Sequence, residues 1–273
     1  MNNKLNIQSI FDSIDGEANG FDGAGQLCTF IRLKGCNLHC QWCDTKYAQE
    51  SEPANWMTID EIVSQVHFPK VTITGGDPFI QPEGLAALVL RLTNKHKSIT
   101  IETNGSLDIP EGVIEHKLAD LDAKLVGPNT PVRLCSHYTL VELQNVRLVV
   151  DFKLSSSGMM GKMDRRIFEK LRSVDVVKFV IADENDYKQA LEVISWLPGE
   201  ARKVMSPAIE IKEAVLPFRF ISEGFWCKAS KDIKIVDPDW PRQLVEMMIR
   251  DRVPAQFSLQ LHKLIWPGVR EER

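Results

Sequence analysis

The chain has 273 residues, of which 44% are hydrophobic, and 33 basic against 37 acidic residues give a formal net charge of −4. This length and apolar content suit a large core within one α/β unit, and the near-balanced charge argues against a protein that mainly coats nucleic acid. No apolar run approaches the roughly 20 residues of a membrane span, and the amino-terminal segment lacks the apolar centre of a signal peptide, so we expect a cytoplasmic protein.

Short apolar, β-branched runs alternate along the chain with segments in which apolar residues recur at helical spacing. The predicted strands are 27–33, 70–74, 98–103, 145–154, 176–182, 201–206 and 257–265. The predicted helices are 58–66, 83–96, 165–174, 184–197 and 241–251. Thr58, followed three residues later by Glu61, is typical of a capping box at the start of the first helix.

This alternation favours an α/β fold in which crossover helices connect parallel strands, either as an open doubly wound sheet or as a barrel. Two stretches, 107–144 and 208–237, fit the alternation poorly. We interpret both as insertions in a single domain that spans residues 1–273.

Polar residues follow the ends of the first four predicted strands. These residues are Cys36, Cys40 and Cys43, then 74–77, then 102–104, then 151–157. Because the carboxyl ends of parallel strands form one functional rim, the sequence predicts that these segments surround a single cavity.

Three of the six cysteines lie within residues 36–43, and their spacing would also suit one packed face of a helix. Gly35 and Asn37 favour a loop instead. In a reducing compartment such a cluster is typical of a metal site rather than of disulfides. The remaining three, Cys28, Cys135 and Cys227, are isolated and are predicted to pack in the interior.

A structural zinc site needs four ligands, usually in two pairs, and no second pair with suitable spacing is present. A four-iron cluster normally takes four thiolates. With three, one iron keeps an open coordination position, which is a feature of reactive metal centres rather than of electron carriers.

The stretch CNLHCQWC matches the CxxxCxxC motif of radical S-adenosylmethionine (SAM) enzymes, and the whole chain resembles the 7-carboxy-7-deazaguanine synthase family. The segments that carry the resemblance are FDSIDGE, FIRLKGCNLHCQWCDT, ITGGDP, IETNG, DFKLSSSGM and QLHKLIW, in this order. The resemblance implies an incomplete TIM-type barrel with a radical SAM core. It also implies a lyase that converts 6-carboxy-5,6,7,8-tetrahydropterin to 7-carboxy-7-deazaguanine with loss of ammonia, in the pathway to queuosine and other 7-deazapurines.

The cofactors that the resemblance implies are a 4Fe-4S cluster, SAM and Mg²⁺. Its partners would be the pterin substrate, an electron donor such as flavodoxin or ferredoxin, and a second copy of the chain in a homodimer. Direct contact with nucleic acid or a membrane is not expected.

The resemblance also implies residue roles. It assigns the cluster to Cys36, Cys40 and Cys43 and Mg²⁺ to Thr45, a hydroxyl ligand suited to a hard cation. The implied substrate-binding residues are Ile14, Asp15, Gly16, Glu17, Arg32, Thr74 and His262. The implied SAM-binding residues are Gly75, Gly76, Asp77, Glu102, Asn104, Asp151, Phe152, Lys153, Ser155 and Ser206.

Two residues depart from the family pattern: Asp15 replaces a glutamine, and Asp77 is one methylene shorter than the expected glutamate. Several assignments have a plainer alternative. Arg32 could form an internal salt bridge, His262 could be a core residue, and the serines could cap strand ends.

Other function classes also remain open at this point. One is a different radical SAM enzyme, such as a glycyl-radical activating enzyme. The others are a non-catalytic iron–sulfur electron carrier and a zinc-binding interaction module.

Overall fold

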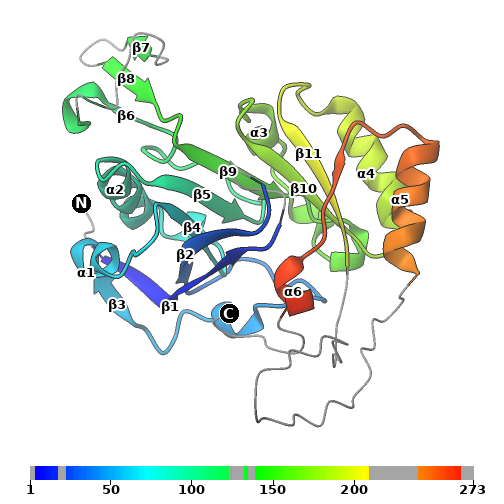
Figure 1. Ribbon diagram of the computed structural model, residues 1–273, viewed down its shortest axis with the longest axis horizontal. Coiled ribbons are helices and arrows are strands. Elements are labelled where there is room, and N and C mark those ends of the chain that lie inside the picture. The colour runs from blue at the N-terminus through cyan, green and yellow to red at the C-terminus, as the bar shows by residue number, and fades with distance from the viewer. Residues whose placement is uncertain are drawn as a thin grey trace, which may run out of the picture.

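The computed structural model describes residues 4–17, 23–122, 124, 132–134, 139–208 and 239–265. Within these residues one nine-stranded sheet crosses the molecule in the order β12-β11-β10-β9-β5-β4-β2-β1-β3 (Figure 1). Its strands are β1 (Lys4–Asp15), β2 (Gln26–Leu33), β3 (Trp56–Thr58), β4 (Lys70–Gly75), β5 (Ser98–Thr103), β9 (Val146–Asp151), β10 (Val176–Ile181), β11 (Arg202–Pro207) and β12 (Gln256–Phe257).

The strands from β2 to β12 in this order pair in parallel, while β1 runs antiparallel to β2 and β3 runs antiparallel to β1. The edge strands of the sheet are β3 and β12, and they do not pair with each other, so these strands form a barrel that does not close. The predicted fold class, an incomplete barrel of parallel strands with crossover helices, is confirmed.

Most helices lie on the outer side of the sheet (Figure 1). They are α1 (Ile59–Ser64), α2 (Pro82–Thr93), α3 (Arg165–Glu169), α4 (Glu184–Trp196), α5 (Trp240–Arg250) and α6 (Leu261–Ile265). The predicted capping box at α1 is confirmed, because Glu61 N donates to Thr58 Oγ1 at 3.3 Å and Thr58 N donates to Glu61 Oε2 at 2.7 Å. No helix among the described residues is both long and apolar enough to span a bilayer.

The two faces of the sheet differ in chemistry, because side chains alternate along each strand. Toward the helices the strands present residues such as Ile31, Ile73 and Ile101, which belong to the main hydrophobic core. Toward the inside of the barrel the alternate positions are largely polar. They include Arg32, Lys70, Thr72, Thr74, Thr100, Glu102, Asp151, Lys178 and Ser206.

A second, small apolar cluster of Val149, Val176 and Val204 lies at alternate positions of β9, β10 and β11. These positions follow the same alternation as the inner polar residues. Buried polar side chains are unfavourable without partners, so this inner face is built to bind something polar or to pair its own charges.

Several predicted bounds were wrong. Residues 257–265 were predicted as a strand, but only Gln256–Phe257 pairs with β11, and Leu261–Ile265 is helical. The chain turns away from the sheet after Ser258, and Leu261 N donates to Gly16 O at 2.8 Å. This tertiary contact overrides the alternating pattern that suggested a strand. The predicted third helix, 165–174, ends at Glu169, and the second ends at Thr93.

The long strand β1 was not predicted from the sequence. The first proposed insertion, 107–144, contains a small antiparallel sheet of β6 (Glu115–Lys117), β7 (Val132–Leu134) and β8 (Thr139–Glu142). The second, 208–237, lies outside the described residues except for Ala208. The division into one domain with two insertions therefore stays a prediction.

Candidate active site

The cysteine loop leaves the carboxyl end of β2, as predicted. Gly35 N donates to Ala48 O at 2.8 Å and Cys36 N donates to Gln49 O at 2.9 Å, so the loop folds back on itself. All three of its thiols are free. Burial raises the pKa of Cys36 and of Cys40, and the neighbouring Cys43 thiol adds to both shifts.

Among the described residues, no three Cys, His, Asp or Glu side chains are grouped closely enough to hold a single metal ion. In a four-iron cluster each thiolate binds a different iron, so wider spacing is expected. The donor set therefore fits a cluster with three protein ligands rather than a zinc site. The separate Cys28 is buried, as predicted, while Cys135 and Cys227 lie outside the described residues.

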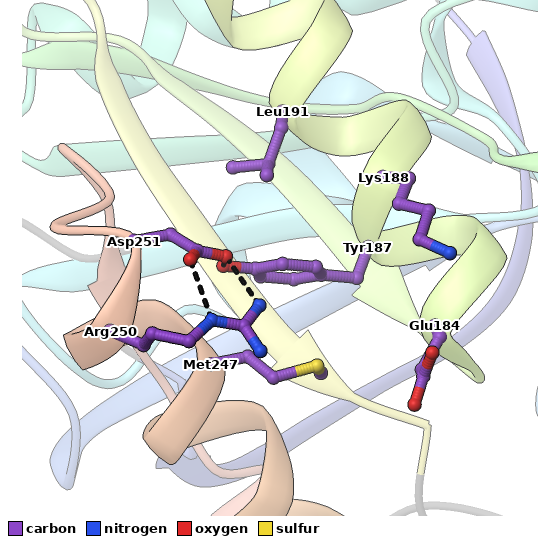
Figure 2. Close-up of a pocket in the computed structure, with 7 residues that line it drawn as sticks. All are labelled: Glu184, Tyr187, Lys188, Leu191, Met247, Arg250 and Asp251. Carbon is purple, nitrogen blue, oxygen red and sulfur yellow. Dashed lines mark hydrogen bonds and ion pairs between the residues drawn. The ribbon is translucent and has the colours of Figure 1, made fainter.

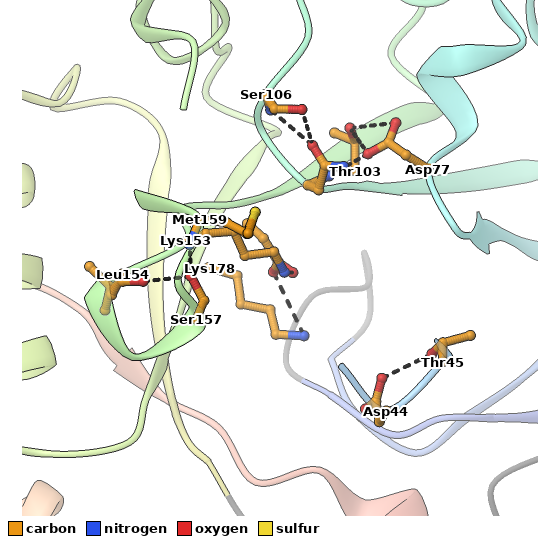
Figure 3. Close-up of polar contacts among 12 residues, drawn as sticks. Asp44, Thr45, Asp77, Thr103, Ser106, Lys153, Leu154, Ser157, Met159 and Lys178 are labelled. Atoms are coloured by element: carbon orange, nitrogen blue, oxygen red, sulfur yellow. Dashed lines mark hydrogen bonds and ion pairs between the residues drawn. The ribbon is translucent and has the colours of Figure 1, made fainter. Parts of the chain in front are cut away.

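Asp77 follows β4, and its side chain is hydrogen-bonded to the end of β5, beside the cysteine loop (Figure 3). Its carboxylate is fully buried and accepts hydrogen bonds from Phe79 N at 2.8 Å, Thr103 Oγ1 at 2.9 Å and Asn104 N at 2.7 Å. Asp77 and Asn104 were both expected to contact SAM, but the structure gives the Asp77 carboxylate only these internal partners. Sequence reasoning missed Thr103, which looked like one more β-branched strand residue.

Gly75 and Gly76 allow β4 to end in close contact with the cysteine loop. Gly75 has φ +142°, and a Cβ there would lie 2.1 Å from Leu33 O. A Cβ on Gly76 would lie 1.9 Å from Gly35 O. The backbone bonds Gly76 N to Leu33 O and Asp77 N to Gly35 O fix this approach.

Replacing Gly76 with alanine is therefore expected to lower the free energy of unfolding by about 3 kcal/mol and to reduce the iron bound after reconstitution. The clash is with backbone atoms, which cannot rotate away. Urea unfolding and iron analysis would measure both effects. Gly161→Ala is the matched control, since nothing lies within 4 Å of a Cβ at that glycine; equal behaviour of the two variants would contradict the prediction.

Three ion pairs cross the inner face of the barrel. Lys70 Nζ lies 3.2 Å from Asp15 Oδ2, Lys178 Nζ lies 2.6 Å from Glu17 Oε2, and Lys153 Nζ lies 2.5 Å from Asp151 Oδ2. Lys178 also lies 3.9 Å from Asp151 (Figure 3). Lys70 and Lys178 were not predicted as site residues. The available signal was a lysine within an otherwise apolar strand, which needs a buried anion.

Asp15 is the residue that replaces the family's glutamine, and its pairing with Lys70 gives this departure a structural role. Burial raises the pKa of Asp15, against the effect of Lys70, and both side chains are almost fully buried. The carboxylate is therefore engaged within the protein.

Gly16 and Glu17, which follow β1, are in contact with residues 260–262 near the other end of the described chain. Besides Lys178, Glu17 accepts a hydrogen bond from Gln260 Nε2 at 2.8 Å. A Cβ on Gly16 would lie 2.7 Å from His262 Nδ1, so these two residues are in contact. His262 thus lies beside the proposed substrate segment, although on α6 and not on a strand. Burial lowers the pKa of His262, which keeps the imidazole neutral at pH 7.

Arg32 has no carboxylate partner among the described residues. Its guanidinium carbon lies 5.6 Å from the ring centroid of Phe11 and 5.8 Å from that of Tyr47, and its buried Nε lacks a hydrogen-bond partner. The internal salt bridge considered as an alternative is therefore absent from this part of the chain. A guanidinium near two rings, with a buried Nε that has no hydrogen-bond partner among the described residues, is suited to bind an anionic ligand.

Glu102 faces the same inner space as these ion pairs. Burial raises the pKa of Glu102 to about 7, Lys178 opposes the shift, and the carboxylates of Glu17 and Asp15 add to it. Near neutral pH this carboxyl group exists in both forms, so it can either donate or accept a hydrogen bond.

The raised pKa of Glu102 predicts a pH-dependent stability. Glu102 loses its proton near pH 7 in the folded protein but near pH 4.5 in the unfolded chain. The stabilisation that protonated Glu102 gives the fold is therefore complete below pH 4.5, decreases as the pH rises, and is lost once the pH has passed through 7. In Glu102→Gln this loss cannot occur. Relative to the wild type, the variant's free energy of unfolding should rise by up to about 3 kcal/mol between pH 4.5 and 7.

Urea titrations at pH 5 and pH 8 would measure this difference. Glu83→Gln, at an exposed position at the start of α2, is the control. A constant difference between Glu102→Gln and the wild type across this range would contradict the prediction.

Two further predicted site residues, Thr45 and Phe152, differ in the groups that their side chains contact. Thr45 Oγ1 donates to Asp44 Oδ1 at 2.9 Å, which places two side-chain oxygens next to each other. The ring of Phe152 packs against Phe168, Phe179 and Trp196 in the core, so only its backbone can face the site.

The serines also differ in their surroundings. Ser155 lies within hydrogen-bond reach of Asp186 and Asn185, near the start of α4. Ser157 is buried and donates to Leu154 O. Ser206 is buried, and its hydroxyl has no hydrogen-bond partner among the residues that the structure describes.

A separate hollow lies on the outer side of the molecule between α4 and α5 (Figure 2). Tyr187 donates to Asp251 at 2.9 Å there, and Arg250 pairs with the same carboxylate at 2.7 Å. None of the predicted site residues lines this hollow. We assign it no part in the candidate site.

Comparison with known proteins gives consistent results. Residues 30–134 match the family model of the radical SAM superfamily. The chain is 32% identical over 270 residues to the 7-carboxy-7-deazaguanine synthase of Chlorobaculum tepidum, covering 96% of this chain and 94% of the relative. It is 33% identical over 262 residues to the enzyme of that name from Clostridium acetobutylicum, covering 94% and 93%.

The crystal structure of QueE from Escherichia coli resembles this fold with a TM-score of 0.60 and 19% sequence identity, over 95% of each chain. At this identity the likeness supports the fold alone. The sequence similarity to the named synthases, in contrast, covers 94–96% of this chain, and the radical SAM family model matches the part that contains the cysteine loop. This chain therefore belongs to the 7-carboxy-7-deazaguanine synthase family of radical SAM proteins.

Proposed function

We propose that the chain is a radical SAM lyase that converts 6-carboxy-5,6,7,8-tetrahydropterin to 7-carboxy-7-deazaguanine with loss of ammonia. The observation that carries this proposal is the position of three free thiols beside a polar inner face on which Arg32 has no carboxylate partner among the described residues. The full-length similarity to named synthases favours this reaction over that of a glycyl-radical activating enzyme or an electron carrier.

The charges of the inner face are complementary to a substrate with one carboxylate. Three lysines are neutralised by three carboxylates, in the pairs Lys70–Asp15, Lys178–Glu17 and Lys153–Asp151. Arg32 is left to bind the substrate carboxylate with its two parallel donors. Thr74 and His262, with the backbone of residues 14–16, would hydrogen-bond to the pterin edge, and Glu102 would contact SAM.

The radical chemistry itself is supplied by the 4Fe-4S cluster and SAM when both are bound. Cys36, Cys40 and Cys43 would each hold one iron of the cluster. The backbone at Gly75 and Gly76 and the polar groups of Asp151, Lys153, Ser155 and Ser206 would hold SAM beside it. Asp77 and Phe152 would contribute by fixing the backbone, because their side chains are engaged within the protein.

Further parts of the proposal rest on the family resemblance. Thr45, beside Asp44, would bind Mg²⁺, which prefers oxygen ligands. Flavodoxin or ferredoxin would supply the electron, and two copies of the chain would form a homodimer. The use of free cysteines for a metal centre fits a cytoplasmic location.

The decisive experiment reconstitutes the cluster without oxygen and supplies SAM, Mg²⁺, a reductant and 6-carboxytetrahydropterin. We expect mass spectrometry to detect 7-carboxy-7-deazaguanine, and Cys40→Ala to abolish it. Formation of 5′-deoxyadenosine alone would show that the substrate is a different one. If neither product forms on a verified four-iron cluster, the proposed function is wrong.

A further inference from the structure

Cys36 is surrounded differently from the other two cysteines of the loop. Its sulfur accepts hydrogen bonds from Leu38 N at 3.4 Å and from Asn104 Nδ2 at 3.7 Å. For Cys40 and Cys43 no hydrogen bond to sulfur is found among the described residues. One of the three proposed cluster ligands therefore receives a donor from the side chain that directly follows β5.

The amide of Asn104 is held in one orientation. Its Oδ1 accepts from Ser106 N at 3.0 Å and from Ser106 Oγ at 2.6 Å, and a backbone N–H can only donate. The oxygen of the amide must therefore face Ser106, and the nitrogen must face the cysteine loop.

The two hydrogens of Nδ2 are both used in this arrangement. One is directed to Asn37 Oδ1 at 2.9 Å and the other to Cys36 Sγ. The Asn104 backbone is fixed as well, by the bond from its N–H to the buried Asp77. The residue is 6% exposed, and its side chain has no donor left for another ligand.

A donor to a cluster thiolate favours the more negative, reduced state of the cluster, and hydrogen bonds to sulfur are one of the determinants of its reduction potential. The low polarity of a buried site strengthens the effect. We propose that Asn104 is a positioning residue whose amide donates to the Cys36 thiolate and raises the reduction potential of the cluster. This role replaces the SAM contact expected from the sequence.

The inference rests on the cluster-binding part of the proposed function, and its test needs neither substrate nor turnover. The reduction potential of the anaerobically reconstituted protein would be measured by EPR-monitored titration without SAM. For Asn104→Leu we expect the reduced-to-oxidised ratio at a fixed potential to fall roughly tenfold, a shift of about 59 mV to lower potential for one electron.

Asn37→Ala is the matched control. It removes the other bond of the same amide and the bond from Asn37 Nδ2 to Ser106 Oγ at 2.7 Å, but it keeps both bonds from Ser106 to Asn104 Oδ1 and the donor to Cys36, so its potential should equal that of the wild type. If Asn37→Ala shifts the potential as much as Asn104→Leu, loop geometry and not the hydrogen bond is responsible, and the inference is overturned.

Ser106→Ala provides a second test of the hydrogen bond if the Asn104→Leu protein does not bind a four-iron cluster. Loss of the orienting hydroxyl should lower the potential in the same direction by a smaller amount. An unchanged potential in Ser106→Ala, or in a four-iron Asn104→Leu protein, overturns the inference. Failure of the wild type to assemble any four-iron cluster would instead contradict the proposed function.

Discussion

Replacing Lys178 with methionine is expected to lower the free energy of unfolding by about 3–5 kcal/mol, because the change leaves buried carboxylates without their cation. Lys178 lies 2.6 Å from Glu17 and 3.9 Å from Asp151, and both Lys178 and Glu17 are almost fully buried. Urea unfolding of the cluster-free protein at pH 7 would measure the loss.

Two further variants test whether the loss of stability comes from the buried, unpaired charge. The double variant Lys178→Met with Glu17→Gln should recover part of the stability, since it removes the uncompensated charge. Lys170→Met breaks an exposed pair with Asp108 and should change the free energy of unfolding by at most about 1 kcal/mol. If Lys178→Met costs no more than Lys170→Met, the buried pair does not stabilise the fold.

The second large effect is expected for Arg32. Arg32→Met should reduce kcat/KM for the pterin by roughly 10-fold to 150-fold, the equivalent of losing a charge-assisted hydrogen-bonded pair worth about 1.5–3 kcal/mol. Arg32→Lys keeps the charge but loses the planar fork, so its reduction should be smaller. Steady-state kinetics with each variant would measure both.

The free energy of unfolding should change little in Arg32→Met, because no ion pair is lost within the described residues. The contacts with Phe11 and Tyr47 are worth about 0.5–1 kcal/mol at most. Arg91→Met, which breaks an exposed pair with Asp60, is the control for removing a guanidinium. An unchanged kcat/KM in Arg32→Met would exclude Arg32 as the carboxylate ligand.

The sequence was informative wherever the signal was local. The runs 70–74 and 98–103 are dense in β-branched residues, and the structure contains strands there with bounds within one residue. Gly35 and Asn37, which flank the first cysteine, indicated a loop at a strand end for the same reason. These features depend on neighbours a few positions away.

Features that depend on distant partners could not be predicted. The alternation of polar and apolar residues in β1 is interrupted by a register shift between Ile7 and Ser9, where the strand pairs with β2, and this shift hides the strand pattern. The partner of Lys178 is Glu17, far away along the chain, and that of Lys70 is Asp15. Only the fold reveals these pairs, although a lysine inside an apolar strand already indicated that some buried anion was required.

The two departures from the family pattern also became interpretable through distant contacts. Asp15 is compensated by Lys70, so a shorter acidic side chain in place of glutamine leaves no unpaired charge. Asp77 is short enough for its carboxylate to remain at the strand end, where Thr103 and the Asn104 backbone donate to it.

The contact between Glu17 and Gln260 has a consequence for synthesis on the ribosome. Gln260 lies 243 residues after Glu17 and therefore emerges after it, as does Leu261, which donates to Gly16 O. Until then the polar interior stays uncovered on that side, while the cysteine loop and its supporting strands β2, β4 and β5 are already complete. This side of the candidate site therefore closes after the stage at which the cysteine loop can first fold.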